Sequence, residues 1–232
     1  MTVHPVDFEV FKNLFLSIAE EMGVTLCRTG FSPNIKERLD YSCAVYDAQG
    51  ETISQGDHMP VHLGAMPLSV RAAIDAVPME RGDVVMLNDP FQGGTHLPDI
   101  TLVSPVFLAR ERAPAFYVAN RAHHSDVGGM SPGSMPVARE IYQEGLILPP
   151  VRLVRRGRMA EDVLAIILAN VRTPDEREGD LTAQIAANRV ADSRLRDTVR
   201  RYGRARTVGY GRALQDYTER VLRATIKEIP NG

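Results

Sequence analysis

The sequence has 232 residues, of which 44% are hydrophobic and 24% are charged, and its formal net charge is −2. This composition is that of a globular protein and excludes a disordered chain, and the near-neutral charge argues against nucleic acid as a partner. The two cysteines, Cys27 and Cys43, have no paired spacing, and the first residues do not resemble a signal peptide. We therefore expect a cytoplasmic protein. No apolar run approaches the ~18 residues of a membrane span, so no membrane association is expected.

Helical and strand patterns alternate in the first two thirds of the chain. Apolar residues recur at helical spacing over residues 6–22, which predicts an amphipathic helix that ends near Gly23. Residues 41–46 and 51–54 flank a short polar turn that ends in glycine and predict a hairpin. The other predicted elements of this part are a helix over 64–77 and strands over 83–88, 101–108 and 115–120.

The pattern becomes helical after about residue 160. A short apolar helix is predicted over 160–171, and the run Thr173-Pro174-Asp175-Glu176 predicts the start of a long one. Thr173 is placed to cap this helix, Pro174 suits its first position, and Glu176 is placed to complete a capping box. The long helix is expected to reach about Tyr202, and another follows to about residue 228.

These patterns predict an α/β fold, with an α+β fold as the alternative. A β-rich core with intervening loops, over residues 41–156, is followed by a helical C-terminal segment. As domains, we expect a mixed α/β unit over residues 1–157 that holds a metal site. Residues 158–232 would form a helical segment packed on that unit or on a partner.

Two polar loops rich in glycine and proline, residues 88–99 and 122–130, hold most of the reactive side chains. Such loops are where a rigid scaffold usually presents functional groups. They contain His96, Asp99, His123, His124 and Asp126. Imidazole and carboxylate groups together suit Zn²⁺, Mn²⁺ or Fe²⁺. The residues alone leave two hypotheses open, a metal site and a hydrogen-bonded polar cluster.

The spacing within the loops favours a three-ligand site. His96 and Asp99 are three residues apart and can both point inward from one loop, and His123 would complete the set. Each loop follows a predicted strand, and a parallel or mixed sheet can bring such strand ends together at one edge. His58, His62 and Asp89 are assigned to substrate binding, with a purely structural role as the alternative for the two histidines.

Several other chemistries are excluded by the absence of their motifs. The sequence has no Gly-Lys-Ser/Thr phosphate-binding loop, and its three lysines never follow a glycine. It also lacks HExxH and GxGxxG. If the reaction uses ATP, this chain does not bind it through a P-loop.

Several motifs in a fixed order resemble the hydantoinase B/oxoprolinase family. They occupy residues 34–44, 56–64, 88–99, 123–129 and 170–184, so the resemblance spans nearly the whole chain. The family includes B subunits of ATP-dependent N-methylhydantoinases, the matching half of 5-oxoprolinases, and subunits of acetone and acetophenone carboxylases.

The resemblance implies a division of labour between subunits. A hydantoinase A-type partner binds ATP and Mg²⁺ and phosphorylates the substrate or activates bicarbonate. The B-type chain then completes hydrolysis of a cyclic amide at a divalent metal (Zn, Mn or Fe), which makes it part of a carbon–nitrogen hydrolase and of a hetero-oligomer. The alternatives are a subunit of an ATP-dependent ketone carboxylase and a truncated, non-catalytic assembly module.

The resemblance also assigns residues. It makes His96, Asp99 and His123 the metal ligands, with Glu37 or Asp40 as a further carboxylate. His124 and Asp126 receive catalytic roles beside the metal, where a carboxylate can shuttle a proton. Family subunits generally continue beyond this length, so the C-terminal half is expected to be missing here, and a separate C-terminal half is a further expected partner.

Overall fold

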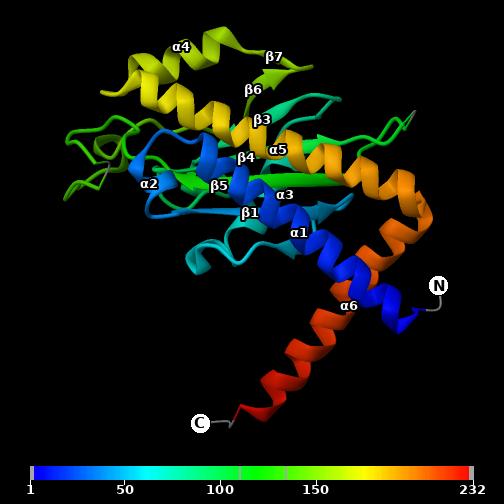
Figure 1. Ribbon diagram of the computed structural model, residues 1–232. Helices are drawn as coiled ribbons and strands as arrows, with labels where there is room; N and C mark the ends of the chain where they lie inside the picture. The colour runs from blue at the N-terminus through cyan, green and yellow to red at the C-terminus, as the bar shows by residue number, and fades with distance from the viewer. Residues whose placement is uncertain (1–2, 110, 134, 230–232) are drawn as a thin grey trace.

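The computed structural model describes residues 3–109, 111–133 and 135–229, and its centre is one seven-stranded sheet (Figure 1). The strand order is β2-β1-β5-β4-β3-β6-β7, and every pairing is antiparallel. The strands are β1 (Tyr41–Asp47), β2 (Thr52–Gln55), β3 (Val84–Leu87), β4 (Asp99–Val106), β5 (Phe116–His123), β6 (Val151–Arg155) and β7 (Arg158–Met159). The fold is therefore α+β, which is the predicted alternative. The expectation of a parallel or mixed sheet is wrong, because every strand pair is antiparallel.

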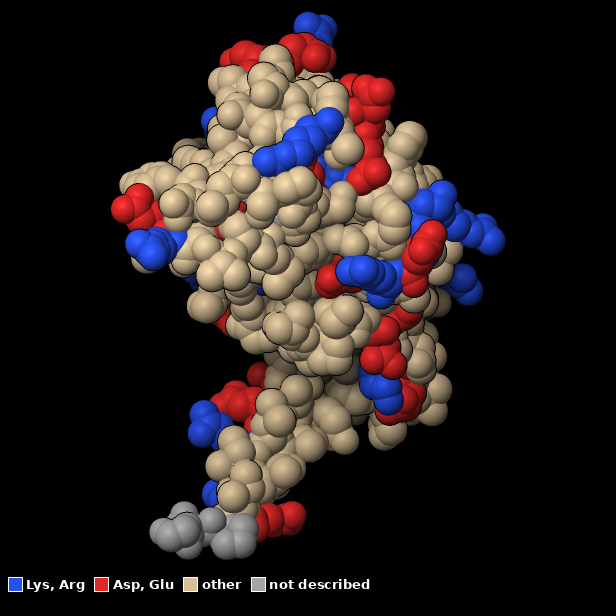
Figure 2. Space-filling view, turned by 90° about the vertical axis from the view of Figure 1, so that its left-hand side faces the viewer, with Lys and Arg blue, Asp and Glu red and all other residues tan. Residues whose placement is uncertain are grey.

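Helices cover both faces of this sheet. They are α1 (Pro5–Thr29), α2 (Pro33–Lys36), α3 (Met66–Ala76), α4 (Glu161–Ala169), α5 (Pro174–Tyr202) and α6 (Arg204–Glu228), with short 3-10 helices η1 (Pro60–His62), η2 (Pro90–Gln92) and η3 (Ile141–Gln143). Helices α1 and α5 pack side by side on one face, and α3 packs on the other (Figure 1). The far end of α6 extends away from the body (Figures 1 and 2). Among the described residues, no helix is both long enough and apolar enough to cross a membrane.

Strand β5 contributes side chains to two hydrophobic cores, one on each face of the sheet. Successive side chains of a strand point to opposite faces of its sheet. Phe116 and Val118 therefore enter the core under α1 and α5. Tyr117 and Ala119 enter the core under α3. Burial on both faces explains why residues 116–119 of this strand are apolar without alternation.

Helix α1 continues past its predicted end. Gly23 lies inside the helix, which runs to Thr29 and ends at Gly30. A Cβ at Gly23 would lie 2.2 Å from Nε2 of His58. The glycine therefore makes room for a packed imidazole from another segment, and it does not terminate the helix.

The helices predicted beyond residue 160 are confirmed, but the predicted capping box is wrong. Pro174 stands at the start of α5 as expected, while Thr173 makes no side-chain capping hydrogen bond. The Glu176 carboxylate instead accepts a hydrogen bond from Oγ of Ser125 (2.7 Å) and pairs with Arg177. The tertiary contact with Ser125 thus replaces the local cap. One apolar cluster joins residues of α1, β1, β5, α5 and α6, and a domain boundary at residue 157 stays a prediction.

A buried amide network fastens α5 to the sheet. Nδ2 of Asn188 donates to Oγ of Ser104 (2.9 Å) and to the carbonyl of Leu102 (3.3 Å). Nδ2 of Asn120 donates to Oδ1 of Asn188 (2.8 Å). All of these polar groups are buried away from water, so each needs a hydrogen-bond partner within the protein.

We expect Asn188→Ala to lower the free energy of unfolding by roughly 1–3 kcal/mol, because it leaves buried partners unsatisfied. Urea denaturation measures this change. Asn13→Ala removes an exposed asparagine from α1 and serves as the control, with little expected effect. Equal stabilities of the two variants would contradict the assignment of the network as a structural clamp.

Candidate metal centre

Asp99 and His123 are brought together by the register of two strands. β4 begins at Asp99, β5 ends at His123, and the antiparallel ladder pairs the two residues directly. Nδ1 of His123 lies 3.2 Å from Oδ1 of Asp99. The predicted strands over 101–108 and 115–120 left both residues in loops, whereas the observed strands include them. β4 therefore begins, and β5 ends, at the candidate metal centre.

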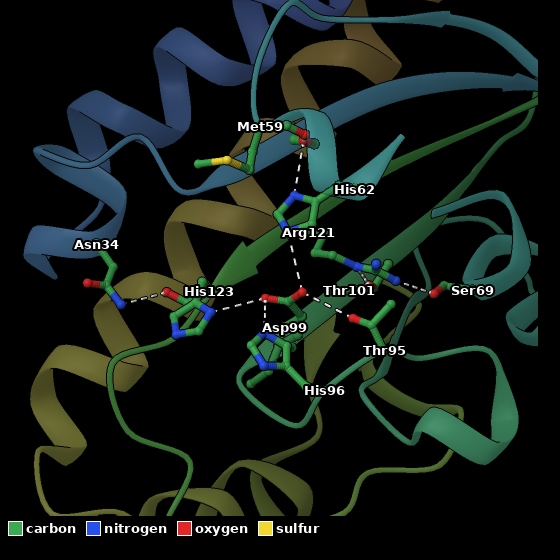
Figure 3. A network of polar contacts seen from close by, with 12 residues as sticks. Asn34, Met59, His62, Ser69, Thr95, His96, Asp99, Thr101, Arg121 and His123 are labelled. Atoms are coloured by element: carbon green, nitrogen blue, oxygen red, sulfur yellow. Dashed lines mark hydrogen bonds and ion pairs between the residues drawn. The ribbon is translucent and has the colours of Figure 1, made fainter. Parts of the chain in front are cut away.

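His96 completes the predicted trio from the loop before β4. Its Nε2 lies 3.0 Å from Oδ1 of Asp99, and the rings of His96 and His123 have centroids 5.0 Å apart (Figure 3). One ligand atom from each of the three residues lies within 4.8 Å of the others. The three side chains therefore converge on one place, as the sequence predicted.

The second oxygen of Asp99 is held by two further residues. Oγ1 of Thr95 donates to Oδ2 of Asp99 (3.1 Å), and Nε2 of His62 lies 3.3 Å from the same oxygen. Nδ1 of His62 lies 3.1 Å from Oγ of Ser42 on β1. His62, predicted to bind substrate, thus contacts the central carboxylate of the cluster.

The environment of Asp99 keeps its carboxylate ionised. Its side chain is almost fully buried, and burial raises the pKa of a carboxyl group. Hydrogen bonds with His123, His62 and His96 outweigh that effect and hold the pKa of Asp99 well below its usual range. The hydrogen bond to Asp99 in turn raises the pKa of His96. A buried anion ringed by imidazole nitrogens is a donor set that fits a divalent cation.

The cluster lies at the bottom of an open pocket of about 490 Å³. The lining residues are Asp40, Met59, Val61, His62, Thr95, His96, Asp99, His123 and Met135. Asp40 also accepts the backbone N–H of His123 on its carbonyl (3.0 Å), and its negative charge helps raise the pKa of His96. Glu37 is exposed and does not line the pocket. Of the two carboxylates proposed as a further ligand, the structure brings only Asp40 to the pocket.

His124 and Asp126 do not line this pocket, which corrects their assignment beside the metal. His124 is fully buried, with Nε2 2.9 Å from Oε1 of Gln184 on α5. Burial, reinforced by the positive charge of Arg177, lowers the pKa of His124 to about 4, so its imidazole is neutral at pH 7. Asp126 accepts hydrogen bonds from Arg172 Nη1 (3.0 Å) and the N–H of Gly128 (3.0 Å). The alternation that aims His123 at the pocket turns His124 to the opposite side.

Two of the predicted substrate-binding residues also lie outside the pocket lining. His58 packs against α1, with Nε2 3.7 Å from Oε2 of Glu20. Asp89 caps η2 by accepting hydrogen bonds from the N–H of Phe91 (2.9 Å) and from Nε2 of Gln92 (2.8 Å). Both contacts are structural, and only His62 of the three lines the pocket.

The family model described as Hydantoinase B/oxoprolinase matches residues 4–232. The chain belongs to the hydantoinase B/oxoprolinase family. Among its relatives, an uncharacterized protein of Methanocaldococcus jannaschii is 44% identical over 97% of this chain and 40% of its own length. 5-Oxoprolinase 1 of Arabidopsis thaliana is 37% identical over 97% of this chain and 19% of its own length. The chain thus spans 40% or less of these family members.

Two solved structures share the fold of this chain. The ATP-dependent caprolactamase of Pseudomonas jessenii superposes with a TM-score of 0.90 at 33% identity, over 100% of this chain and 40% of the caprolactamase chain. The β subunit of that organism's caprolactamase is 35% identical over the whole chain and 40% of its own length. An acetone carboxylase superposes with a TM-score of 0.81 at 21% identity, over 90% of this chain and 28% of the carboxylase chain, a likeness of fold alone.

Proposed function

We propose that this chain is the metal-binding, N-terminal part of a B-type subunit of an ATP-dependent cyclic-amide hydrolase. The observation that carries the proposal is the Asp99 carboxylate, which is ionised, buried and in contact with three histidines at the bottom of an open pocket. A carboxylate with converging imidazoles is the ligand set of many divalent metal sites.

Four residues would hold the metal, namely His96, Asp99, His123 and Asp40. A bound dication would polarise a carbonyl group or lower the pKa of a bound water to about 7. The other groups of the pocket have supporting tasks. His62 and Thr95 fix the direction of the Asp99 carboxylate, and this orients the ligand set before the metal binds.

Hydrolysis of a cyclic amide is favoured over carboxylation of a ketone. The caprolactamase and 5-oxoprolinase 1 of Arabidopsis thaliana are similar to this chain at 33–37% identity over nearly all of it. The acetone carboxylase is 21% identical and supports the common fold without favouring its reaction.

The active enzyme is proposed to be a hetero-oligomer. The relative from Pseudomonas jessenii is a β subunit, and this chain has no P-loop for ATP. ATP and Mg²⁺ would bind an A-type partner. Val61 and Met135 at the pocket are apolar residues that are 74% and 70% exposed, which leaves room for a second polypeptide to cover them. Figure 2, viewed from the side where α2 lies in Figure 1, shows a broad area without charged side chains.

Reconstitution tests this proposal. The purified chain alone should hydrolyse neither ATP nor a cyclic amide. With an A-type subunit and the C-terminal part of a B-type subunit, ATP-dependent ring opening of a lactam, hydantoin or 5-oxoproline is expected, measured as release of the open-chain product.

Three results would contradict it. Strong ATPase activity of the isolated chain would show that no partner is needed. Consumption of bicarbonate with a small ketone would favour the carboxylase alternative. A stable complex whose turnover does not depend on metal would favour a non-catalytic assembly module.

A further inference from the structure

Arg121 is a buried cation directly beneath the proposed metal centre. It lies two residues before His123 on β5 and is paired with Thr101 on β4, so its side chain is on the same face of the sheet as Asp99 and His123. Its side chain is fully buried. Nε donates to Oγ1 of Thr101 (2.9 Å), and Nη2 donates to Oγ of Ser69 on α3 (Figure 3). Among the described residues, Nη1 has no hydrogen-bond partner.

A short chain of hydrogen bonds links Arg121 to the loop that carries His96. Oγ of Ser69 accepts from Arg121 and donates to the carbonyl of Gly93. Gly93 has a φ of 90°, and a Cβ there would lie 2.7 Å from Cβ of Ala72 and 2.8 Å from the carbonyl of Leu68. The loop is therefore pressed onto α3 three residues before His96, and the Arg121–Ser69–Gly93 chain of hydrogen bonds holds it there.

The arrangement is poorly suited to stability alone. A buried cation without full hydrogen bonding is costly, and well-packed apolar replacements of buried ionic groups are often neutral or stabilising. The hydrogen bonds of Arg121 connect it to Thr101, two residues after Asp99 on β4, and through Ser69 to the loop that carries His96.

We infer that Arg121 is a positioning residue that sets the place of His96 relative to Asp99 and His123. This inference rests on the proposed metal-binding function. Arg121 does not touch substrate, because its side chain is buried under the pocket. Its effect passes through Ser69 and Gly93 to the loop of the histidine.

The test is the affinity of the full chain for Zn²⁺, measured by competition with a chromophoric chelator, together with the visible absorption of the Co²⁺-loaded protein. Arg121→Met should weaken Zn²⁺ binding by about 10–100-fold, the usual effect of losing a group that orients a ligand. It should also change the Co²⁺ spectrum, because the geometry of the ligands changes. Ser69→Ala interrupts the same chain of hydrogen bonds and should act in the same direction. Arg71→Met, on the exposed side of α3, is the control and should have no effect.

The direction of the change in Zn²⁺ affinity distinguishes a positioning role of Arg121 from a purely electrostatic effect of its charge. Removing a positive charge near a cation site would by itself strengthen Zn²⁺ binding, so equal or tighter binding by Arg121→Met overturns the positioning role. Arg121→Lys retains the charge without the forked geometry and should not restore wild-type affinity. If Arg121→Met does not fold, unchanged affinity in Ser69→Ala overturns the inference. Failure of the wild-type chain to bind Zn²⁺ or Co²⁺ would instead overturn the proposed function itself.

Discussion

Replacing Asp99 with asparagine is expected to abolish tight metal binding, with a loss of affinity of at least about 100-fold, more than is usual for the residues that support a ligand. Oδ1 of Asp99 faces His96 and His123 at 3.0 and 3.2 Å, so Asp99 is the centre of the ligand set. Asparagine has the same shape but no charge, and its amide nitrogen is a donor where the histidines need an acceptor.

The measurement is metal content after dialysis against limiting Zn²⁺, with circular dichroism to verify the fold. Asp75→Asn removes the same charge from an exposed position on α3 and should leave metal content unchanged. His96→Ala should also lose metal, whereas His4→Ala, at an exposed position, should not. Full metal content in Asp99→Asn would place the ion elsewhere and remove the observation on which the proposed function depends.

Replacing Gly94 with alanine is expected to cost roughly 3 kcal/mol or more of unfolding free energy, because overpacking against fixed backbone is among the most destabilising changes. A Cβ at this position would lie 2.2 Å from the carbonyl oxygen of Asn88 and 2.7 Å from that of Asp89. Asn88 cannot move aside easily. Its buried amide donates to the carbonyls of Leu97 and Leu146 and accepts from the N–H of Leu148.

Urea denaturation monitored by circular dichroism measures this effect. Gly64→Ala is the matched control, since nothing lies within 4 Å of a Cβ at that position. The same clash should displace the loop that carries His96, so any folded Gly94→Ala protein should bind Zn²⁺ more weakly. A variant that is as stable as Gly64→Ala would show that the loop adapts, and the close approach to Asn88 would then not be a requirement of the fold.

Local patterns account for the elements that could be predicted. Apolar periodicity determines α1 and the helices beyond residue 160, and strand patterns with a short turn determine the β1–β2 hairpin. His96 and Asp99 could be paired from sequence because three residues in one loop limit how far apart they can lie. These features depend on neighbours along the chain, and the sequence displays such neighbours directly.

The remaining features depend on contacts between distant segments. The strand register pairs Asp99 with His123, and η1 brings His62 to the same carboxylate. Asp40 lines the pocket whereas Glu37 does not, a choice that depends on the path of the chain after α2. His124 turns toward α5 because adjacent side chains alternate.

Gly23 and Thr173 show that a local sequence signal can also be overridden by a distant contact. Each carries a local signal for a helix end or cap, and in each case a distant partner decided the outcome, His58 for Gly23 and Ser125 for the start of α5. By itself the sequence determined where the long helices lie and which segments carry the reactive histidines, because those properties arise within a few residues. Only the tertiary structure decided which of those histidines share one carboxylate, because that depends on how strands far apart in the chain pair across the sheet.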